Sequence, residues 1–169
     1  MNNEVLVNAF RFVVLVLLQV LIFNHIHFLG FISPFVYVLF IILYPVRKDK
    51  QGVFLLTAFF LGLTIDIFSD SGGVNAAASV FIAYLRPVVL KFAFGNVYEF
   101  QNLKISQTAL GQRLVYISIL ILTHHLLLFS LEIFSFADIL SILKKTLLAG
   151  VFTIFLSFLA IPLFRRKKT

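Results

Sequence analysis

Several residue types are absent or scarce in this chain of 169 residues, and each shortage excludes a class of protein. There is no cysteine, which excludes disulfide bonds, thiolate metal sites, iron–sulfur ligation and thiol catalysis. There is no tryptophan, and charged residues make up only 12% of the sequence. Globular domains carry about 25% charged residues, so an ordinary soluble domain, a disordered chain and a nucleic-acid-binding module are all excluded.

Apolar residues, by contrast, make up 61% of the sequence, and the mean hydropathy is +1.06. A chain of 19.2 kDa lacks the interior volume to hide that many apolar side chains from water, so we expect its surroundings to be the lipid bilayer. The length predicts one domain over residues 1–169, since about 100–200 residues is the usual unit. The net charge of +7 comes from short cationic clusters between apolar runs, which is typical of membrane-flanking anchors.

The apolar runs predict an all-α integral membrane bundle of about six transmembrane helices, because about 20 largely apolar residues cross a ~30 Å hydrocarbon core. The expected helices lie near residues 8–24, 33–46, 53–68, 74–93, 114–131 and 146–164. We interpret the first run as a membrane helix and not as a cleaved signal, because it has no basic leader and no small-residue cleavage site follows it.

The distribution of basic residues predicts how the bundle is oriented. With loops assigned alternately to the two sides, one side holds only Lys144 and Lys145, and the other holds Arg11, Arg47, Lys48, Lys50, Lys91, Lys104, Arg113 and the tail 165–168. The positive-inside rule then places both termini in the cytoplasm. The outside loops, near 25–32, 69–73 and 131–145, are too short to form an external catalytic domain.

Asp66 is the clearest functional candidate, because a carboxylate inside a bilayer is energetically costly. Gly62 lies four residues earlier on the same helix face and lets another backbone approach closely. Asp66 is then able to bond to the partner helix or to the following turn. We favour a structural polar anchor over a catalytic acid, because no second acid lies close by to form an acid–base pair.

The turn after this helix contains Ser69, Gly72 and Gly73, followed by Asn75. The two glycines are able to adopt positive φ, and free N–H groups at the start of the next helix are able to hold an anion. A plain turn before a capped helix explains the same residues. The small residues at 75–79 favour close helix packing over a ligand cavity, so we interpret the segment as a packing seam.

Arg86 and Pro87 interrupt the fourth apolar run. Proline removes a backbone donor and kinks a helix, while we expect Arg86 to extend its cation to the cytoplasmic headgroups.

His124 and His125 lie in the fifth run. Adjacent helical residues point about 100° apart, so hydrogen bonds between helices are favoured over a shared metal ion. We find no catalytic motif, and the sequence predicts neither an enzyme nor a cofactor.

Residues 61–85 resemble the MreD family of bacterial rod shape-determining membrane proteins. That family has a Gly-x-x-x-Asp helix end, a short Ser/Gly turn, a polar residue, small residues, and an apolar helix ending in Ala-Tyr-Leu. The matching positions here are Gly62, Asp66, Ser69, Gly73, Asn75, Ala76 and Ala83–Leu85. Arg86 and Pro87 look like the version found in Bacteroidota-type bacteria.

The resemblance implies a non-enzymatic scaffold of the cell-elongation machinery in the bacterial cytoplasmic membrane. Such proteins bind an MreC-like partner and act indirectly with MreB-like filaments, the RodA glycosyltransferase and its transpeptidase partner, in lateral peptidoglycan synthesis and cell shape. An alternative stays open, because the substrate-binding S-components of energy-coupling-factor vitamin transporters are similar small six-helix proteins. They would need a polar pocket near the outer face, which residues 66–75 could line.

Overall fold

The computed structural model describes residues 3–26, 33–47, 50–95, 103 and 105–164, and this part is helical with no β-strand. Five of its helices are long and apolar enough to cross a membrane: α1 (Asn3–Leu21), α3 (Gln51–Ser69), α4 (Val74–Phe94), α5 (Leu110–Ile133) and α6 (Ile139–Ala160). The predicted all-α membrane bundle is therefore confirmed. Most of the predicted outside loop at 25–32, and the basic tail at 165–168, lie outside the described residues.

Single turns of 3-10 helix flank the long helices. They are η1 (Phe23–His25), η4 (Ile105–Gln107), η5 (Phe136–Asp138) and η6 (Ile161–Phe164). The last long helix starts at Ile139, seven residues before the predicted 146, so Lys144 and Lys145 lie within α6 and not in a loop.

The second apolar run, predicted as a membrane helix over 33–46, contains only α2 (Val38–Leu43), and that prediction is wrong. A helix of six residues is ~9 Å long, far short of the ~30 Å core. Prolines flank α2, and the second of them explains where it ends. Pro34 stands in the non-helical segment that leads into α2, and Tyr44 has an extended ψ of 140° because Pro45 follows it.

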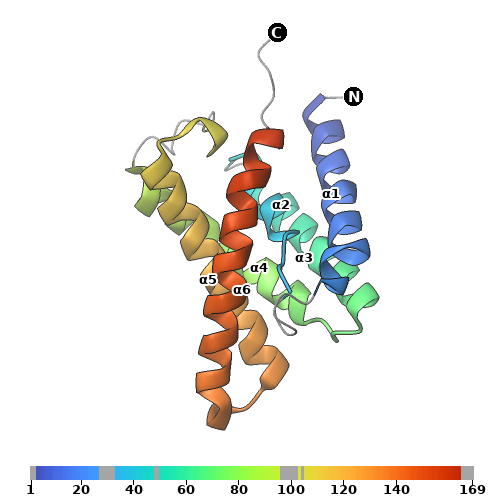
Figure 1. Cartoon of the computed structure of the whole chain (residues 1–169). Coiled ribbons are helices and arrows are strands. Elements are labelled where there is room, and N and C mark those ends of the chain that lie inside the picture. The colour runs from blue at the N-terminus through green and yellow to red at the C-terminus, as the bar shows by residue number, and fades with distance from the viewer. Residues whose placement is uncertain (1–2, 27–32, 48–49, 96–102, 104, 165–169) are drawn as a thin grey trace.

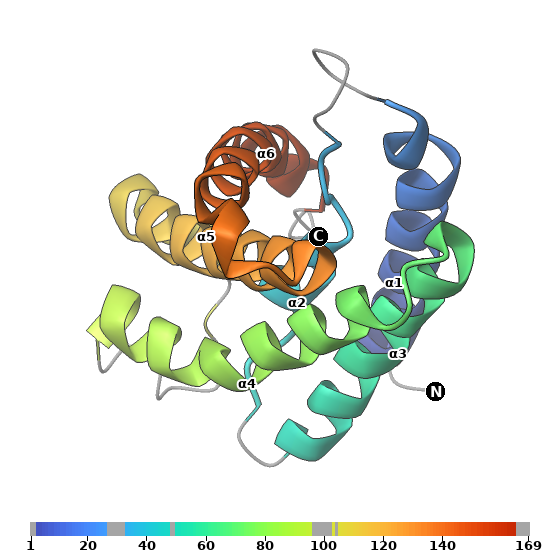
Figure 2. The same ribbon diagram turned by 90° about the horizontal axis from the view of Figure 1, so that it is seen from below.

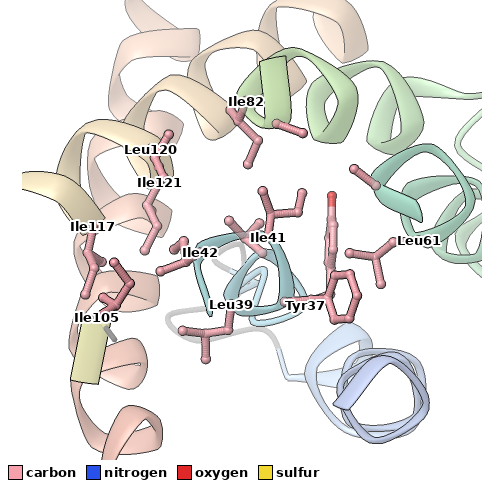
Figure 3. Close-up of a cluster of buried hydrophobic side chains, with 14 of the residues drawn as sticks. Tyr37, Leu39, Ile41, Ile42, Leu61, Ile82, Ile105, Ile117, Leu120 and Ile121 are labelled. Atoms are coloured by element: carbon pink, nitrogen blue, oxygen red, sulfur yellow. The ribbon is translucent and has the colours of Figure 1, made fainter. Parts of the chain in front are cut away.

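The short helix α2 lies at the centre of the bundle. Figure 2 shows α1 and α3 on one side of it, α5 and α6 on the other, and α4 crossing from one group to the other. Residues 38–42 are all buried. In Figure 3 the side chains around α2 meet those of the surrounding helices; the labelled residues are Tyr37, Leu39, Ile41, Ile42, Leu61, Ile82, Ile105, Ile117, Leu120 and Ile121.

Large apolar side chains cover the outside of the bundle. Phe10 on α1, Ile67 on α3 and Phe92 on α4 are 67%, 71% and 75% exposed. Water would make such a surface unfavourable, whereas lipid tails are as apolar as these side chains. The chain is accordingly a multi-pass membrane protein.

The path of the chain places one set of turns at each end of the bundle. Figure 1 shows α1 beginning and α6 ending at the same end, while the α3–α4 turn and the α5–α6 connection lie towards the other. Consecutive long helices from α3 to α6 pack against one another, and α1 packs against α3. The polar residues described next lie between these helices.

Candidate functional site: a buried polar network around α2

Helices α3 and α4 touch at Gly62. A Cβ atom added there would lie 2.5 Å from both the Ala76 Cα and the Asn75 carbonyl oxygen. Real Cβ atoms do not approach backbone this closely, so only glycine permits this contact. The approach places Asp66, one helical turn after Gly62, beside the first turn of α4.

The Asp66 carboxylate caps α4 from the neighbouring helix. Its Oδ2 accepts the Ala76 N–H at 2.8 Å and its Oδ1 accepts the Asn75 N–H at 2.9 Å. The residue at the N-cap position itself, Gly73, has no side chain to do this. A negative charge is stabilised at a helix N-terminus, where unpaired N–H groups carry partial positive charge. Asp66 is 4% exposed, so these bonds are formed away from water.

The turn between the two helices needs the glycines that it contains. Gly72 and Gly73 have φ values of 66° and 96°, and Asp70 before them is also left-handed at 50°. Ser69 bonds outside the turn, because its Oγ accepts a hydrogen bond of 3.0 Å from the side chain of Asn24 in η1, which follows α1. The turn thus joins α3 and α4 tightly and connects both to α1.

A line of hydrogen bonds runs from Asp66 into the centre of the bundle. Asn75 Nδ2 donates to Asp66 Oδ1 at 3.0 Å, which leaves Asn75 Oδ1 as an acceptor. The Tyr37 hydroxyl, 2.9 Å away, must donate to that oxygen. The tyrosine oxygen therefore accepts from His124 Nε2 at 2.8 Å, an assignment that rests on the bonding pattern. Residues of α3, α4 and α5 converge in this way on the residue that precedes α2.

Ser71 completes the surroundings of the carboxylate. Its hydroxyl donates to Asp66 Oδ1 at 2.6 Å and accepts from Asn75 Nδ2 at 2.9 Å. Asp66 thus receives hydrogen bonds from two backbone N–H groups, one amide and one hydroxyl. A carboxylate with this set of donors is held in place, as a structural anchor requires.

Gln19 of α1 binds the unwound backbone that leads into α2. Its Oε1 accepts the N–H groups of Val36 and Tyr37, at 2.8 and 3.3 Å, and its Nε2 donates to the Pro34 carbonyl at 3.0 Å. Unpaired backbone groups cost several kcal/mol in the absence of water. The fully buried Gln19 side chain therefore supplies the hydrogen-bond partners that a longer helix would have supplied from its own backbone.

Thr153 of α6 binds the same segment from the other side. Its hydroxyl accepts the Phe35 N–H at 3.2 Å and lies 3.2 Å from His125 Nε2. His125 Nδ1 lies 2.8 Å from the Ile121 carbonyl, which is only an acceptor, so Nδ1 carries the proton. The two histidines serve separate hydrogen bonds between helices and do not face a common ion. Among the described residues no group of His, Asp and Glu side chains is arranged to hold a metal.

Arg86 binds the other end of α2, and the expectation that it reaches the headgroups is wrong. Its side chain is 3% exposed; Nε donates to the Tyr116 hydroxyl at 2.8 Å, and Nη2 donates to the carbonyls of Ile42, at 3.3 Å, and Tyr44. The Tyr116 hydroxyl also donates to the Ile42 carbonyl at 3.1 Å. A cation is favourable where free carbonyls end a helix, so the guanidinium turns inwards.

Pro87 lies inside α4, which continues past it to Phe94. Proline has no N–H, so the Ala83 carbonyl, four residues earlier, loses its usual helical donor. Gln51, the first residue of α3, donates to that carbonyl from Nε2 at 3.5 Å. A neighbouring side chain thus replaces the missing bond, as is usual for proline in membrane helices.

A cavity of about 540 Å³ lies beside the α3–α4 turn, at the end of the bundle away from the start of α1 and the end of α6. Its polar lining comes from Asn24, His25, Ser33, Ser69, Ser71, Asn75 and Glu132, and its apolar lining includes Phe35, Phe68 and Leu128. The volume lies within the usual range of small-molecule sites, about 300–1,000 Å³. Because Ser71 and Asn75 belong to its lining, the cavity extends from the α3–α4 turn to the buried network.

The structure brings together most of the residues singled out from the sequence. Gly62, Asp66 and Asn75 form one contact region with the Ser69–Gly73 turn, while Arg86 and Pro87 lie near the far end of α2. Sequence reasoning missed Gln19, Tyr37, Tyr116 and Thr153. A polar residue within an apolar run was the available signal, but each run contains several such residues and the partners of these four lie far away in the sequence.

Comparisons with protein families, with curated proteins and with solved structures find no match to this chain.

Proposed function

We propose that this protein is a non-enzymatic membrane scaffold of the MreD type, which binds an MreC-like partner in the elongation machinery of a bacterial cytoplasmic membrane. The observation that supports this proposal is that the residues through which the chain resembles the MreD family have a structural role. Gly62, Asp66 and Asn75 are occupied in joining α3 to α4, through the backbone contact at Gly62 and the cap on α4. Residues with this role set the shape of a bundle.

The rest of the polar interior agrees with a scaffold. Gln19, Thr153 and Arg86 each bond to backbone groups at the ends of α2. A catalytic site instead needs a nucleophile or an acid–base pair positioned beside a space for substrate. The outer faces of the helices are apolar and present a large area to lipid or to the transmembrane helix of a partner.

The test is a pull-down of the tagged protein from its own membranes in mild detergent, with mass spectrometry of the co-purified proteins. A tagged multi-pass protein of similar size and unrelated function serves as the matched control. We expect an MreC-like protein, with RodA-like and transpeptidase partners, to be enriched over the control. Their absence from a preparation that retains folded bait would contradict the proposal.

The outer cavity supports a second candidate, an S-component of an energy-coupling-factor vitamin transporter. Ser71 and Asn75 lie both in the cavity wall and in the buried network. A substrate bound there would therefore contact groups that fix α3 relative to α4. In the same pull-down this function predicts recovery of a coupling subunit with paired ATPases in place of the elongation proteins.

A further inference from the structure

The cavity of about 540 Å³ beside the α3–α4 turn lies between four of the long helices. Its apolar lining contains Val20 of α1, Phe68 of α3, Val74 of α4 and Leu128 of α5, together with Phe35 from the segment that leads into α2. A molecule in this space contacts all four helices. Its binding would therefore stabilise the folded bundle relative to the unfolded chain.

Several polar groups in the lining are already used in hydrogen bonds within the protein. Ser71 and Asn75 bond to each other, and both donate to Asp66. The Asn24 amide donates to the Ser69 hydroxyl oxygen. These groups hold the wall of the cavity in place, and a ligand that used them would have to replace bonds that the fold needs.

Glu132 provides the charged group of the cavity. It is the only Asp, Glu, Lys or Arg residue among the described residues of the lining. Its carboxylate lies 3.8 Å from the ammonium group of Lys145, and the two side chains are 52% and 40% exposed. An exposed ion pair of this kind contributes little to stability. The Lys145 ammonium also lies 5.7 Å from the centre of the Phe129 ring, a contact that it keeps when Glu132 binds another cation.

We propose that this cavity binds a small organic molecule that carries a primary ammonium group on an apolar body. The ammonium group donates a charge-assisted hydrogen bond to the Glu132 carboxylate, and the apolar body lies against Phe35, Phe68 and Leu128. Because an ionised carboxylate only accepts hydrogen bonds and repels an anion, the opposite charge does not fit. Apolar walls with a few placed polar groups are typical of small-molecule sites.

Two sources of this chemistry reach the outer end of the bundle, which Figure 2 shows facing the viewer. One is a free amine in the surrounding water, and the other is the headgroup of phosphatidylethanolamine, whose ammonium is also primary. Both place the same group on Glu132, and the experiment below separates them.

The test is thermal unfolding of the purified full-length protein in mild detergent, monitored by far-ultraviolet circular dichroism, with and without each probe. The soluble probes are cyclohexylmethylamine and its anionic counterpart, cyclohexanecarboxylate. The lipid probes are short-chain phosphatidylethanolamine and short-chain phosphatidylcholine, whose quaternary ammonium has no hydrogen to donate. The variants are Glu132→Gln and Phe68→Ala. Asp138→Asn is the matched control, because Asp138 is an exposed acid of the α5–α6 connection outside the described lining.

We expect cyclohexylmethylamine, at about ten times its Kd, to raise the Tm of the wild type and of Asp138→Asn by roughly 3–6 °C. The same concentration should raise the Tm of Glu132→Gln by only about 1 °C, which corresponds to binding about tenfold weaker after the loss of a charge-assisted hydrogen bond. Phe68→Ala should also show a reduced rise, because part of the apolar contact is lost. Cyclohexanecarboxylate should leave the Tm of the wild type unchanged.

The lipid probes identify the source. A rise in Tm with phosphatidylethanolamine, absent with phosphatidylcholine and reduced in Glu132→Gln, would assign the site to a lipid headgroup, whereas a rise with the soluble amine alone would assign it to a free amine. The proposal is overturned if neither the amine nor phosphatidylethanolamine raises Tm, if the carboxylate raises it equally, or if Glu132→Gln responds as Asp138→Asn does. None of these outcomes depends on whether an MreC-like partner is recovered.

Discussion

The contact at Gly62 makes Gly62→Ala the most informative single change. The added Cβ would lie 2.5 Å from the Ala76 Cα and 2.6 Å from its nitrogen, and both are backbone atoms that cannot rotate away. Ordinary van der Waals contact needs about 3.4 Å or more. Helices α3 and α4 must therefore separate by about 1 Å.

That separation would also weaken the cap on α4. The bonds from Asp66 to the N–H groups of Asn75 and Ala76, now 2.9 and 2.8 Å long, would exceed hydrogen-bond length after a shift of this size. Overpacking costs about 1–3 kcal/mol, and each hydrogen bond to a charged group contributes about 1.5–3 kcal/mol. Alanine regains about 1 kcal/mol of helix propensity, and relaxation preserves part of the cap. We expect a net loss of about 3 kcal/mol.

The assay is thermal unfolding in mild detergent, monitored by far-ultraviolet circular dichroism. This readout is chosen because the chain has no tryptophan to report on unfolding and no cysteine to label. A loss of 3 kcal/mol predicts that Tm falls by roughly 6–12 °C. Gly111→Ala is the matched control, because an added Cβ there meets nothing within 4 Å; its Tm should be unchanged or slightly higher. A Tm for Gly62→Ala equal to that of Gly111→Ala would refute the argument from the close helix contact.

Three further predictions concern the polar network. Gln19→Leu leaves the two N–H groups that precede α2 without their acceptor, so we expect a loss of about 2–4 kcal/mol in the same assay, while Leu17→Ala on the lipid-exposed face of α1 should change little. Tyr116→Phe removes the hydroxyl that accepts from Arg86 and should lower stability by about 1–3 kcal/mol; an unchanged Tm would mean that this bond is dispensable. Asp66→Asn should lower Tm, because an amide accepts fewer bonds than a carboxylate, yet retain most shape function in a complemented deletion strain. Cells as round as the deletion strain, at normal protein level, would show that the charge itself is required.

Local patterns in the sequence account for most of the architecture. Five apolar runs became long helices, because run length and hydropathy report directly on what a bilayer accepts. The failure at 33–46 also has a local cause. Pro34 and Pro45 bracket the run and leave ten residues between them, too few to cross a membrane, and six of these form α2. Counting apolar residues alone concealed this signal.

The error at Arg86 has a different origin. An arginine eight residues before the end of α4 is within reach of the headgroups, and nothing in its neighbours predicts otherwise. Its inward orientation depends on carbonyls freed where α2 ends, more than 40 residues earlier in the chain. The acceptors exist only because α2 is short, so a prediction that makes α2 a full membrane helix necessarily misplaces Arg86.

The shortness of α2 also explains why an apolar bundle contains so many buried polar side chains. Lipid tails and helix faces are equally apolar, so burial of apolar surface does little to choose one helix arrangement over another. Unpaired backbone groups, in contrast, are strongly unfavourable within a bilayer. By stopping after six residues, α2 leaves backbone groups near both ends that side chains from four different helices bind: Gln19 of α1, Thr153 of α6, Arg86 of α4 and Tyr116 of α5. The broken segment thereby fixes the positions of the helices around it, which is the property that the proposed scaffold function needs.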